Sequence, residues 1–288
     1  MQAERTSGVV PMHLQIADDL RERINSGALQ AGEPLPPVRE LQGQWNCASI
    51  TVRSALTELR QEGLITASGR GKPPVVRPQV QKHPIHLSAR WTNEQKALVL
   101  RPRDERAKRG AIEMIAGIPI DEIISTHVYK DIPAGAELAA EFSIQDTDVL
   151  QQRTYEMKDP KSGHRIAFSV SYIPLDLISS NPELLDDANE PWPGGHQHQL
   201  YTVGIELGRI ERTVTAAEPS SIDREKWGMD VGTPLLKVRS RSIDVQDRVV
   251  ELSDAVYPAD RTKIEVSEQL TPWPAGYPKY NHEQEHGK

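Results

Sequence analysis

Between Leu35 and Gly71 the chain reads LPPVREL (35–41), TVRSALTEL (51–59), EGLI (62–65) and GRG (69–71). Apolar residues at helical spacing predict a short helix and a longer one separated by a tight turn, and the glycine-flanked tip predicts a β-hairpin after them. This order of elements describes a winged helix-turn-helix, in which the second helix enters the major groove of DNA.

The longer helix, expected at 49–62, has two distinct sides. Val52, Ala55, Leu56 and Leu59 follow the spacing of one apolar stripe, which packs against the rest of the region. A first helix at 12–26 and a short one at 37–45 complete the expected core. A small, polar outer side is also common on ordinary surface helices, and a Gly-Arg-Gly tip occurs in ordinary hairpins. The DNA interpretation therefore depends on helix, turn, helix and wing occurring together.

The outward side of this region carries groups that suit DNA. A helix N-terminus attracts phosphate through its free N–H groups and its dipole, and an arginine can bind a guanine edge through two hydrogen bonds. Ile50 can lie against a thymine methyl group, and Ser49 is the expected N-cap of the helix. At the wing, the glycines permit close backbone approach while the arginine between them reaches the minor groove. The predicted DNA-contacting residues are Arg39, Ser49, Ile50, Thr51, Arg53, Ser54, Gly69, Arg70, Gly71 and Lys72.

Composition is that of a soluble protein with two domains. The 288 residues are 37% apolar and 26% charged, and typical domains hold roughly 100–200 residues. No run of about 18 apolar residues predicts a membrane span, and the first residues have no signal-peptide character. A single cysteine, Cys47, cannot form an internal disulfide. These observations predict a cytoplasmic protein.

The net charge of −7 is unevenly distributed along the chain. Residues 1–80 hold nine basic and eight acidic residues, about +1, so the other 25 basic and 33 acidic residues give 81–288 a charge of −8. Because the first part is nearly neutral, DNA binding must depend on where its arginines lie rather than on bulk charge.

Four segments are expected along the chain. They are a winged helix-turn-helix domain at 1–78, a linker and charged helical segment at 79–110, a second domain at 111–270 and a disordered tail at 271–288. In the second domain, β-rich runs occur at 123–129, 148–157, 165–173, 205–216, 235–244 and 248–257, with helices near 136–142 and 220–227. This pattern predicts an α+β fold with a mainly antiparallel sheet.

Several motifs in the first 77 residues match a known family. They are PMHLQIADDLR at 11–21, GALQAGEPLPPVREL at 27–41 and the motifs quoted above between 51 and 71. With them the chain resembles the GntR family of bacterial transcription regulators, which implies dimers that bind palindromic operators. The resemblance assigns DNA contacts to Arg39, Thr51, Arg53 and the wing at 69–71. Ala48 and Ser49 stand where the family usually has Ser-Arg, so one habitual DNA-contacting arginine is missing.

The second domain contains VLQQRTY at 149–155, FSVSYIP at 168–174, GTPLLKVRSR at 232–241 and VVELS at 249–253. These motifs resemble the UTRA ligand-binding domain of the HutC-type GntR subfamily, which implies a chorismate-lyase-like α+β fold without that activity. The resemblance implies effector binding by Arg153, Tyr155, Ser169, Ser171, Glu251 and Tyr257. An arginine there can pair with a phosphate or carboxylate, the serines can donate hydrogen bonds and the glutamate can accept one. The alternative is that these groups cap strands or pair with one another.

We therefore expect a transcriptional regulator, a repressor that binds a DNA operator as a homodimer and is released by a small-molecule effector. The effector is expected to be an anion such as a sugar phosphate or organic acid. The alternative is a ligand-independent repressor of plasmid or phage type, whose second domain serves only dimerisation. We expect no enzyme and no cofactor, because the pyridoxal-phosphate domain of some GntR-headed proteins needs several hundred residues and about 200 remain here. Neither a phosphate-binding glycine loop nor a nucleophile elbow appears.

Two histidine motifs resemble metal sites. His282 to His286 reads HEQEH and matches the HExxH pattern of zinc proteases, but it lies two residues from the end of the sequence with no apolar helix side. His196-Gln197-His198 follows two glycines and is expected to be a polar loop. We expect no metal at either.

Overall fold

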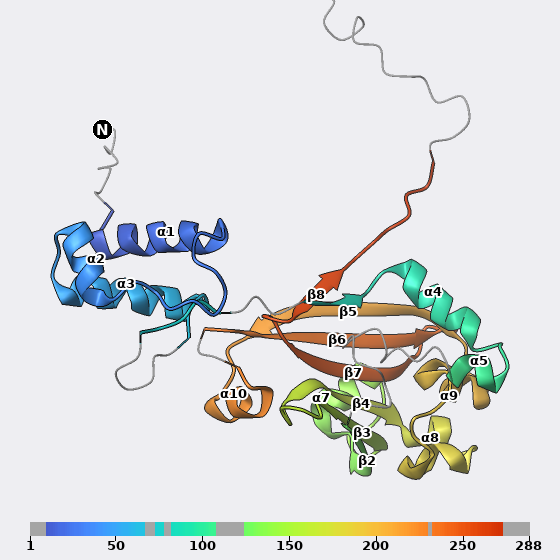
Figure 1. Cartoon of the computed structure of the whole chain (residues 1–288). Helices are drawn as coiled ribbons and strands as arrows, with labels where there is room; N and C mark the ends of the chain where they lie inside the picture. The colour runs from blue at the N-terminus through green and yellow to red at the C-terminus, as the bar shows by residue number, and fades with distance from the viewer. Residues whose placement is uncertain (1–9, 67–72, 78–81, 108–123, 230–231, 273–288) are drawn as a thin grey trace, which may run out of the picture.

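The computed structural model of the chain describes residues 10–66, 73–77, 82–107, 124–229 and 232–272. It consists of a three-helix head, a six-stranded sheet with helices around it, and a separate pair of short strands (Figure 1). The head lies at one end of the sheet (Figure 1).

The head is built from α1 (Met12–Asn25), α2 (Val38–Trp45) and α3 (Ser49–Gln61). Asn46, in the left-handed conformation with φ 44°, ends α2 and turns the chain into α3; asparagine tolerates this conformation better than most residues. The expected apolar stripe of α3 is confirmed, because its members lie in one core with residues of α1, α2 and the wing base. That core contains Ile16, Ala17, Leu20, Leu29, Leu35, Leu41, Val52, Ala55, Leu56, Leu59, Ile65 and Val76.

The structure describes the wing at its base. Ile65 forms an antiparallel bridge with Val76, as expected for a hairpin, but the described residues make isolated bridges rather than regular strands. Pro73 and Pro74 lie beside this base and have no N–H to donate to a longer ladder. Of the predicted DNA-contacting residues, Gly69, Arg70, Gly71 and Lys72 lie outside the described residues.

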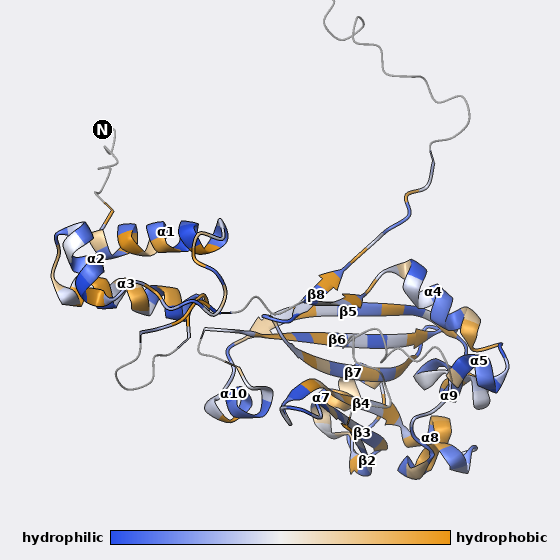
Figure 2. Cartoon of the chain, viewed as in Figure 1, coloured by the Kyte–Doolittle hydropathy of each residue, from blue (hydrophilic) through white to orange (hydrophobic). Residues whose placement is uncertain are grey.

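The large sheet is antiparallel throughout and has the strand order β2-β3-β4-β7-β6-β5. Its strands are β2 (Ile124–Pro133), β3 (Val149–Lys158), β4 (Arg165–Pro174), β5 (Leu207–Ala217), β6 (Leu235–Asp244) and β7 (Val249–Pro258). Apolar and polar residues are interspersed along β5, β6 and β7 (Figure 2). All six expected β-rich runs form this sheet, which confirms the antiparallel α+β fold.

Helices cover both faces of the sheet. On one face, α7 (Gly135–Phe142) packs on Leu150 and Leu252, and Trp227 of α10 (Ser221–Trp227) packs beside Phe168. On the other, an apolar cluster around Ile173 joins the sheet to three short helical elements. They are α8 (Leu175–Ile178), the 3-10 helix η2 (Pro182–Leu185) and α9 (Gly195–Thr202), with the 3-10 helix η3 (Asp187–Asn189) beside them. We call this second face the polar face, because its central residues are polar.

Two segments differ from the organisation expected from the sequence. Residues 79–110, expected as a linker with a charged helical part, contain β1 (His83–His86), α4 (Ala89–Leu98) and α5 (Arg103–Ala107). β1 pairs in parallel with β8 (Thr262–Glu265), so this segment is joined to the far end of the described chain. The expected polar loop at His196–His198 is wrong: it lies in α9, a helix that buries polar side chains and therefore lacks an apolar stripe.

The head contacts the sheet region through the base of its wing. Arg77 donates hydrogen bonds to Asp260 Oδ2 (2.8 Å) and to Thr233 Oγ1 (3.2 Å), and the ion-paired side chains are 14% and 13% exposed. Beside this pair, Gly232 (φ +90°) lies so close to α3 that a Cβ atom there would be 1.7 Å from the carbonyl oxygen of Gln61. The head therefore rests on the sheet region through a partly buried ion pair and a direct backbone contact.

Candidate DNA interface and effector face

The outward side of α3 presents the predicted DNA-contacting residues to solvent. Ile50 is 69% exposed, Ser49 and Arg53 are also exposed, and Thr51 and Ser54 are half-buried. On α2, Arg39 is exposed as well. The described members of the predicted set therefore lie on two helices that are joined by the tight turn.

The N-terminus of α3 has no side-chain cap. Ala48 is the N-cap, with extended backbone (ψ 152°), and no side chain accepts a hydrogen bond there. The expectation that Ser49 is the cap is wrong, because Ser49 already belongs to the helix. The first turn of α3 also contains no acidic residue. Its N–H groups and positive dipole end are therefore available to a phosphate.

Ion pairing distinguishes the arginines of the head. On α1, Arg21 pairs with Asp18 and donates to Glu62 Oε2 (2.7 Å). By contrast, Arg39 and Arg53 form no ion pair with any residue that the structure describes. The two described guanidinium groups expected to contact DNA are thus not neutralised by a described carboxylate; Arg60, further along α3, also lacks such a partner.

All six predicted effector residues lie on the polar face of the sheet. Arg153 and Tyr155 are on β3, and by register they lie opposite Ser171 and Ser169 of β4. Ser171 in turn lies opposite Ser253 of β7. Because side chains alternate between faces, the other two residues on β7 also share this side. These two are Glu251 and Tyr257.

Arg153 is fully occupied by other protein groups. Its side chain is 1% exposed, and it donates to Gln151 Oε1 (2.8 Å), Gln199 Oε1 (2.6 Å) and the Leu184 carbonyl (3.0 Å). Its guanidinium also lies over the ring of Tyr129, 4.5 Å from the centroid. Arg153 therefore ties β3 to α9 and η2.

Glu190 is the acceptor at the centre of the adjoining network, and no sequence motif identified it. It accepts hydrogen bonds from Tyr155 Oη (3.0 Å), Gln199 Nε2 (3.0 Å) and the Trp192 N–H (2.7 Å), and also from Tyr129 Oη. Burial raises the pKa of both tyrosines well above their ordinary value. Both hydroxyls are therefore neutral donors to this carboxylate.

Glu251 lies in a second polar group on the same face. It is 5% exposed, accepts a hydrogen bond from Ser242 Oγ (3.2 Å) and lies 3.5 Å from His196 Nε2 of α9. Tyr257 lies further along β7, where burial raises its pKa to about 12. Glu251 can therefore accept from a ligand hydroxyl, and Tyr257 can donate to one.

A row of hydroxyl groups crosses the middle of the polar face. Arg153, Ser171, Ser253, Ser240 and Arg212 occupy register positions on β3, β4, β7, β6 and β5, and we call these five residues the serine row. The three serine hydroxyls make no hydrogen bond with any described residue. The sequence motifs pointed to Ser171 but missed the register that adds Ser253, Ser240 and Arg212.

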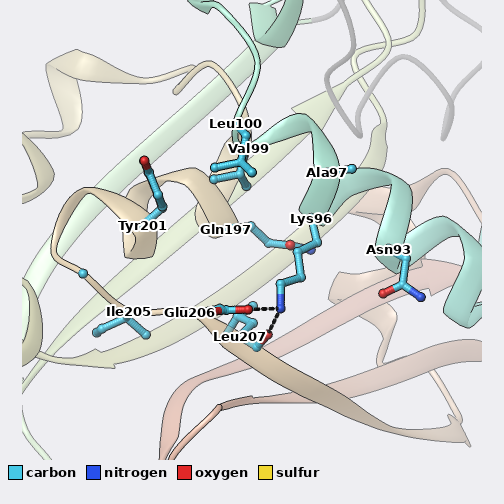
Figure 3. A pocket seen from close by; sticks show the side chains of 11 residues that line it. Asn93, Lys96, Ala97, Val99, Leu100, Gln197, Tyr201, Ile205, Glu206 and Leu207 are labelled. Carbon is cyan, nitrogen blue, oxygen red and sulfur yellow. Dashed lines mark hydrogen bonds and ion pairs between the residues drawn. The ribbon is translucent and has the colours of Figure 1, made fainter.

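A cavity of about 590 Å³ opens beside this face, between α4, α9 and the start of β5 (Figure 3). Lys96 reaches across it from α4 and donates to Glu206 Oε1 (2.6 Å) and the Leu207 carbonyl (2.7 Å). Gln197 of α9 also lines it. None of the six predicted effector residues lies among its lining residues, although α9 connects the cavity to their network.

The described residues contain no group of three or more histidine, cysteine, aspartate or glutamate side chains that could hold a metal ion. His198 Nδ1 instead accepts a hydrogen bond from Trp192 Nε1 (2.9 Å). The HEQEH motif at 282–286 lies outside the described residues. None of the described helices is long and apolar enough to cross a membrane.

Comparison with known proteins identifies both parts of the chain. Residues 13–72 match the gntR family of bacterial regulatory proteins, and residues 125–263 match the UTRA domain. The mannosyl-D-glycerate transport/metabolism system repressor MngR of Escherichia coli is 38% identical over 269 residues, which cover 89% of this chain and 95% of MngR. The transcriptional repressor PhnF of Mycolicibacterium smegmatis is 25% identical over 263 residues, covering 89% and 93%.

A solved structure shows the same fold over nearly the whole chain. The crystal structure of a GntR-family transcriptional regulator superposes with a TM-score of 0.66 at 20% identity, covering 91% of this chain and 98% of that one. Together with the two domain matches and the MngR similarity, this confirms both the winged helix-turn-helix and the UTRA fold. The chain belongs to the GntR family of bacterial transcription regulators, in the HutC-type group that carries a UTRA domain.

Proposed function

We propose that this regulator represses its target genes by binding a palindromic operator as a homodimer, and that a small anionic effector bound on the polar face releases it. The observation that carries the DNA part is that Arg39 of α2 and Arg53 of α3 are exposed and have no described carboxylate partner, and that the N-terminus of α3 is uncapped. Repressors among the relatives, MngR and PhnF, support the direction of regulation.

The DNA part is tested by comparing two arginine variants of the head. Arg53→Ala should weaken operator binding by roughly 1–3 kcal/mol if Arg53 reads a base edge, and relax specificity at one position. Arg23→Ala is the matched control, because Arg23 lies on α1 and faces Asp19 at 3.8 Å. Fluorescence anisotropy on an operator selected from genomic fragments measures both. Equal affinity of Arg53→Ala and wild type would contradict this placement of α3.

The effector part is supported by the free hydroxyls of the serine row and by the name of one relative. MngR represses a mannosyl-D-glycerate system, and glyceric acid derivatives carry both a carboxylate and hydroxyl groups. A ligand of that chemistry suits a face with serines, a glutamate acceptor and arginines. In this proposal the dimer has two arrangements, one that fits the operator and one that does not. An effector that binds the second arrangement more tightly lowers operator occupancy, by an amount set by the ratio of its two affinities.

A titration with operator DNA present tests release. Mannosyl-D-glycerate and sugar phosphates are added to the protein–operator complex, and a binding effector should lower operator affinity, typically 5- to 150-fold for a coupling of about 1–3 kcal/mol. An effector that binds the protein but leaves operator affinity unchanged would contradict release.

The second candidate is a ligand-independent repressor whose UTRA domain serves only dimerisation. The observation that favours it is the internal saturation of Arg153 and Glu190, whose hydrogen bonds all go to other protein groups. A thermal-shift screen separates the candidates, because a ligand at 100 times its dissociation constant stabilises the protein by about 2.7 kcal/mol.

A further inference from the structure

We propose that Arg212, at the β5 end of the serine row, binds the anionic group of a small hydroxylated ligand, while Arg153 at the other end only positions the surrounding elements. This inference rests on the proposed effector function and deepens it, because it names the residue that selects an anion and the class of ligand. The ligand class is a sugar-sized polyol that carries one carboxylate or phosphate.

The hydrogen bonds of Arg212 are long and go to neutral oxygens. Its guanidinium is half-buried and lies 3.5 Å from the Leu87 carbonyl and 3.3 Å from Thr92 Oγ1. No carboxylate of the described residues lies within ion-pair distance of it. A desolvated charge without a counter-charge is unfavourable, so an anion bound there would be stabilising. Burial also lowers the pKa of Arg212, which agrees with an environment short of negative charge.

Other arginines of the sheet are different in this respect. Arg239 donates two hydrogen bonds to Asp254, at 2.7 and 2.8 Å, and Arg165 pairs with Glu156. Both of these pairs lie on the face opposite to the serine row. The arginine on the polar face that lacks both a carboxylate and a saturated set of short hydrogen bonds, within the described chain, is therefore Arg212.

Arg153 is a poor partner for an incoming anion. Each of its three side-chain nitrogens already donates to a protein oxygen at 3.0 Å or less, and its guanidinium is stacked on a tyrosine ring. An anion would have to displace contacts that hold α9 and η2 on the sheet. Arg153 is therefore a positioning residue, which holds α9 and η2 against the sheet.

The serine hydroxyls between Arg153 and Arg212 indicate that the rest of the ligand carries hydroxyl groups. Ser240, Ser253 and Ser171 lie on three adjacent strands, and neighbouring strands are about 4.8 Å apart, so the three hydroxyls span roughly 10 Å. Tyr257 interacts electrostatically with Arg212 and keeps its proton, since its pKa is about 12. A ligand bound to Arg212 therefore extends over groups that recognise hydroxyls.

Calorimetric titration of the full chain tests the inference with four probes: gluconate, glucose 6-phosphate, inorganic phosphate and neutral glucose, at constant ionic strength. Wild type should bind at least one anion and discriminate against glucose. Arg212→Met should weaken that binding at least about tenfold, as expected for one charge-assisted hydrogen bond. Arg209→Met is the matched control, on the same strand but exposed and paired with Asp247 and Glu211, and it should bind as wild type does.

Each outcome decides the inference. Wild-type affinity in Arg212→Met, or no binding of any of the three anions to wild type, would overturn it. Partial recovery in Arg212→Lys would support a role of the charge, and an unchanged melting temperature of Arg212→Met without ligand would exclude misfolding as the cause of lost binding. Comparison of gluconate with the two phosphate probes shows whether the site prefers a carboxylate or a phosphate. Binding that depends on Arg212 but leaves operator affinity unchanged would retain the anion site and contradict only the proposed release mechanism.

Discussion

Arg53 on α3 and Arg153 on β3 occupy opposite environments although both were expected to bind a ligand. Arg53 is exposed and pairs with no described carboxylate, whereas Arg153 is 1% exposed and its guanidinium is hydrogen-bonded on every nitrogen. Truncating an exposed, unpaired side chain changes the free energy of unfolding little, whereas truncating a hydrogen-bonded interior side chain is costly because its buried partners are left unsatisfied. The two arginines therefore differ in role: Arg53 is available to a partner molecule, whereas Arg153 holds parts of the fold together.

The largest expected effect is the loss of Arg153. Arg153→Ala removes three hydrogen bonds and leaves buried acceptors on Gln151, Gln199 and Leu184 without their donor, so the free energy of unfolding should fall by about 3–5 kcal/mol. Arg53→Ala is the comparison and should stay within about 0.5 kcal/mol of wild type, as exposed substitutions do. Urea unfolding followed by circular dichroism measures both, and equal stabilities would contradict the division of roles.

The next effect concerns the contact that joins the two regions. Gly232→Ala places a Cβ atom against the Gln61 carbonyl and also forces alanine into φ +90°. Gly163→Ala is the control for strain alone, because Gly163 has φ +71° and open space around its Cα. The strain costs roughly 1–2 kcal/mol in both, but only Gly232→Ala should push the head off the sheet region and increase the radius of gyration in small-angle X-ray scattering. The same radius for both variants would contradict a close head-to-sheet contact.

Local patterns were enough to predict the head and the sheet. The apolar spacing of Val52, Ala55, Leu56 and Leu59 fits one side of a helix, and the β-rich run at 235–244 forms the strand β6. Both signals come from residues that are neighbours in sequence. The predicted effector residues reached the same face of the sheet for that reason, because two residues separated by one position in a strand share a side.

The hydrogen-bond partners and strand neighbours of the predicted effector residues could not be predicted in the same way. Arg153 is satisfied by Gln199 and Leu184, which lie 46 and 31 residues away, and no local pattern announces such partners. Arg212 joined the row only through strand register, which a single sequence does not give. α9 was mistaken for a loop because it buries glutamines in this network and so shows no apolar stripe.

The smallest effect is a pH dependence confined to the effector side. Burial, followed by the charge of Arg106, lowers the pKa of His198 below its ordinary 6.5, and its neutral Nδ1 accepts the hydrogen bond from Trp192. A lowered pKa means that the unfolded chain binds this proton more readily than the folded one, so the contribution is present above about pH 6.5 and is lost as the pH falls through the folded pKa. The difference in melting temperature between wild type and His198→Gln should therefore shrink from pH 8 to pH 5, while operator affinity of the head is unaffected by the substitution. A pH-independent difference would mean that folding leaves the pKa of His198 unchanged, and it would contradict this prediction.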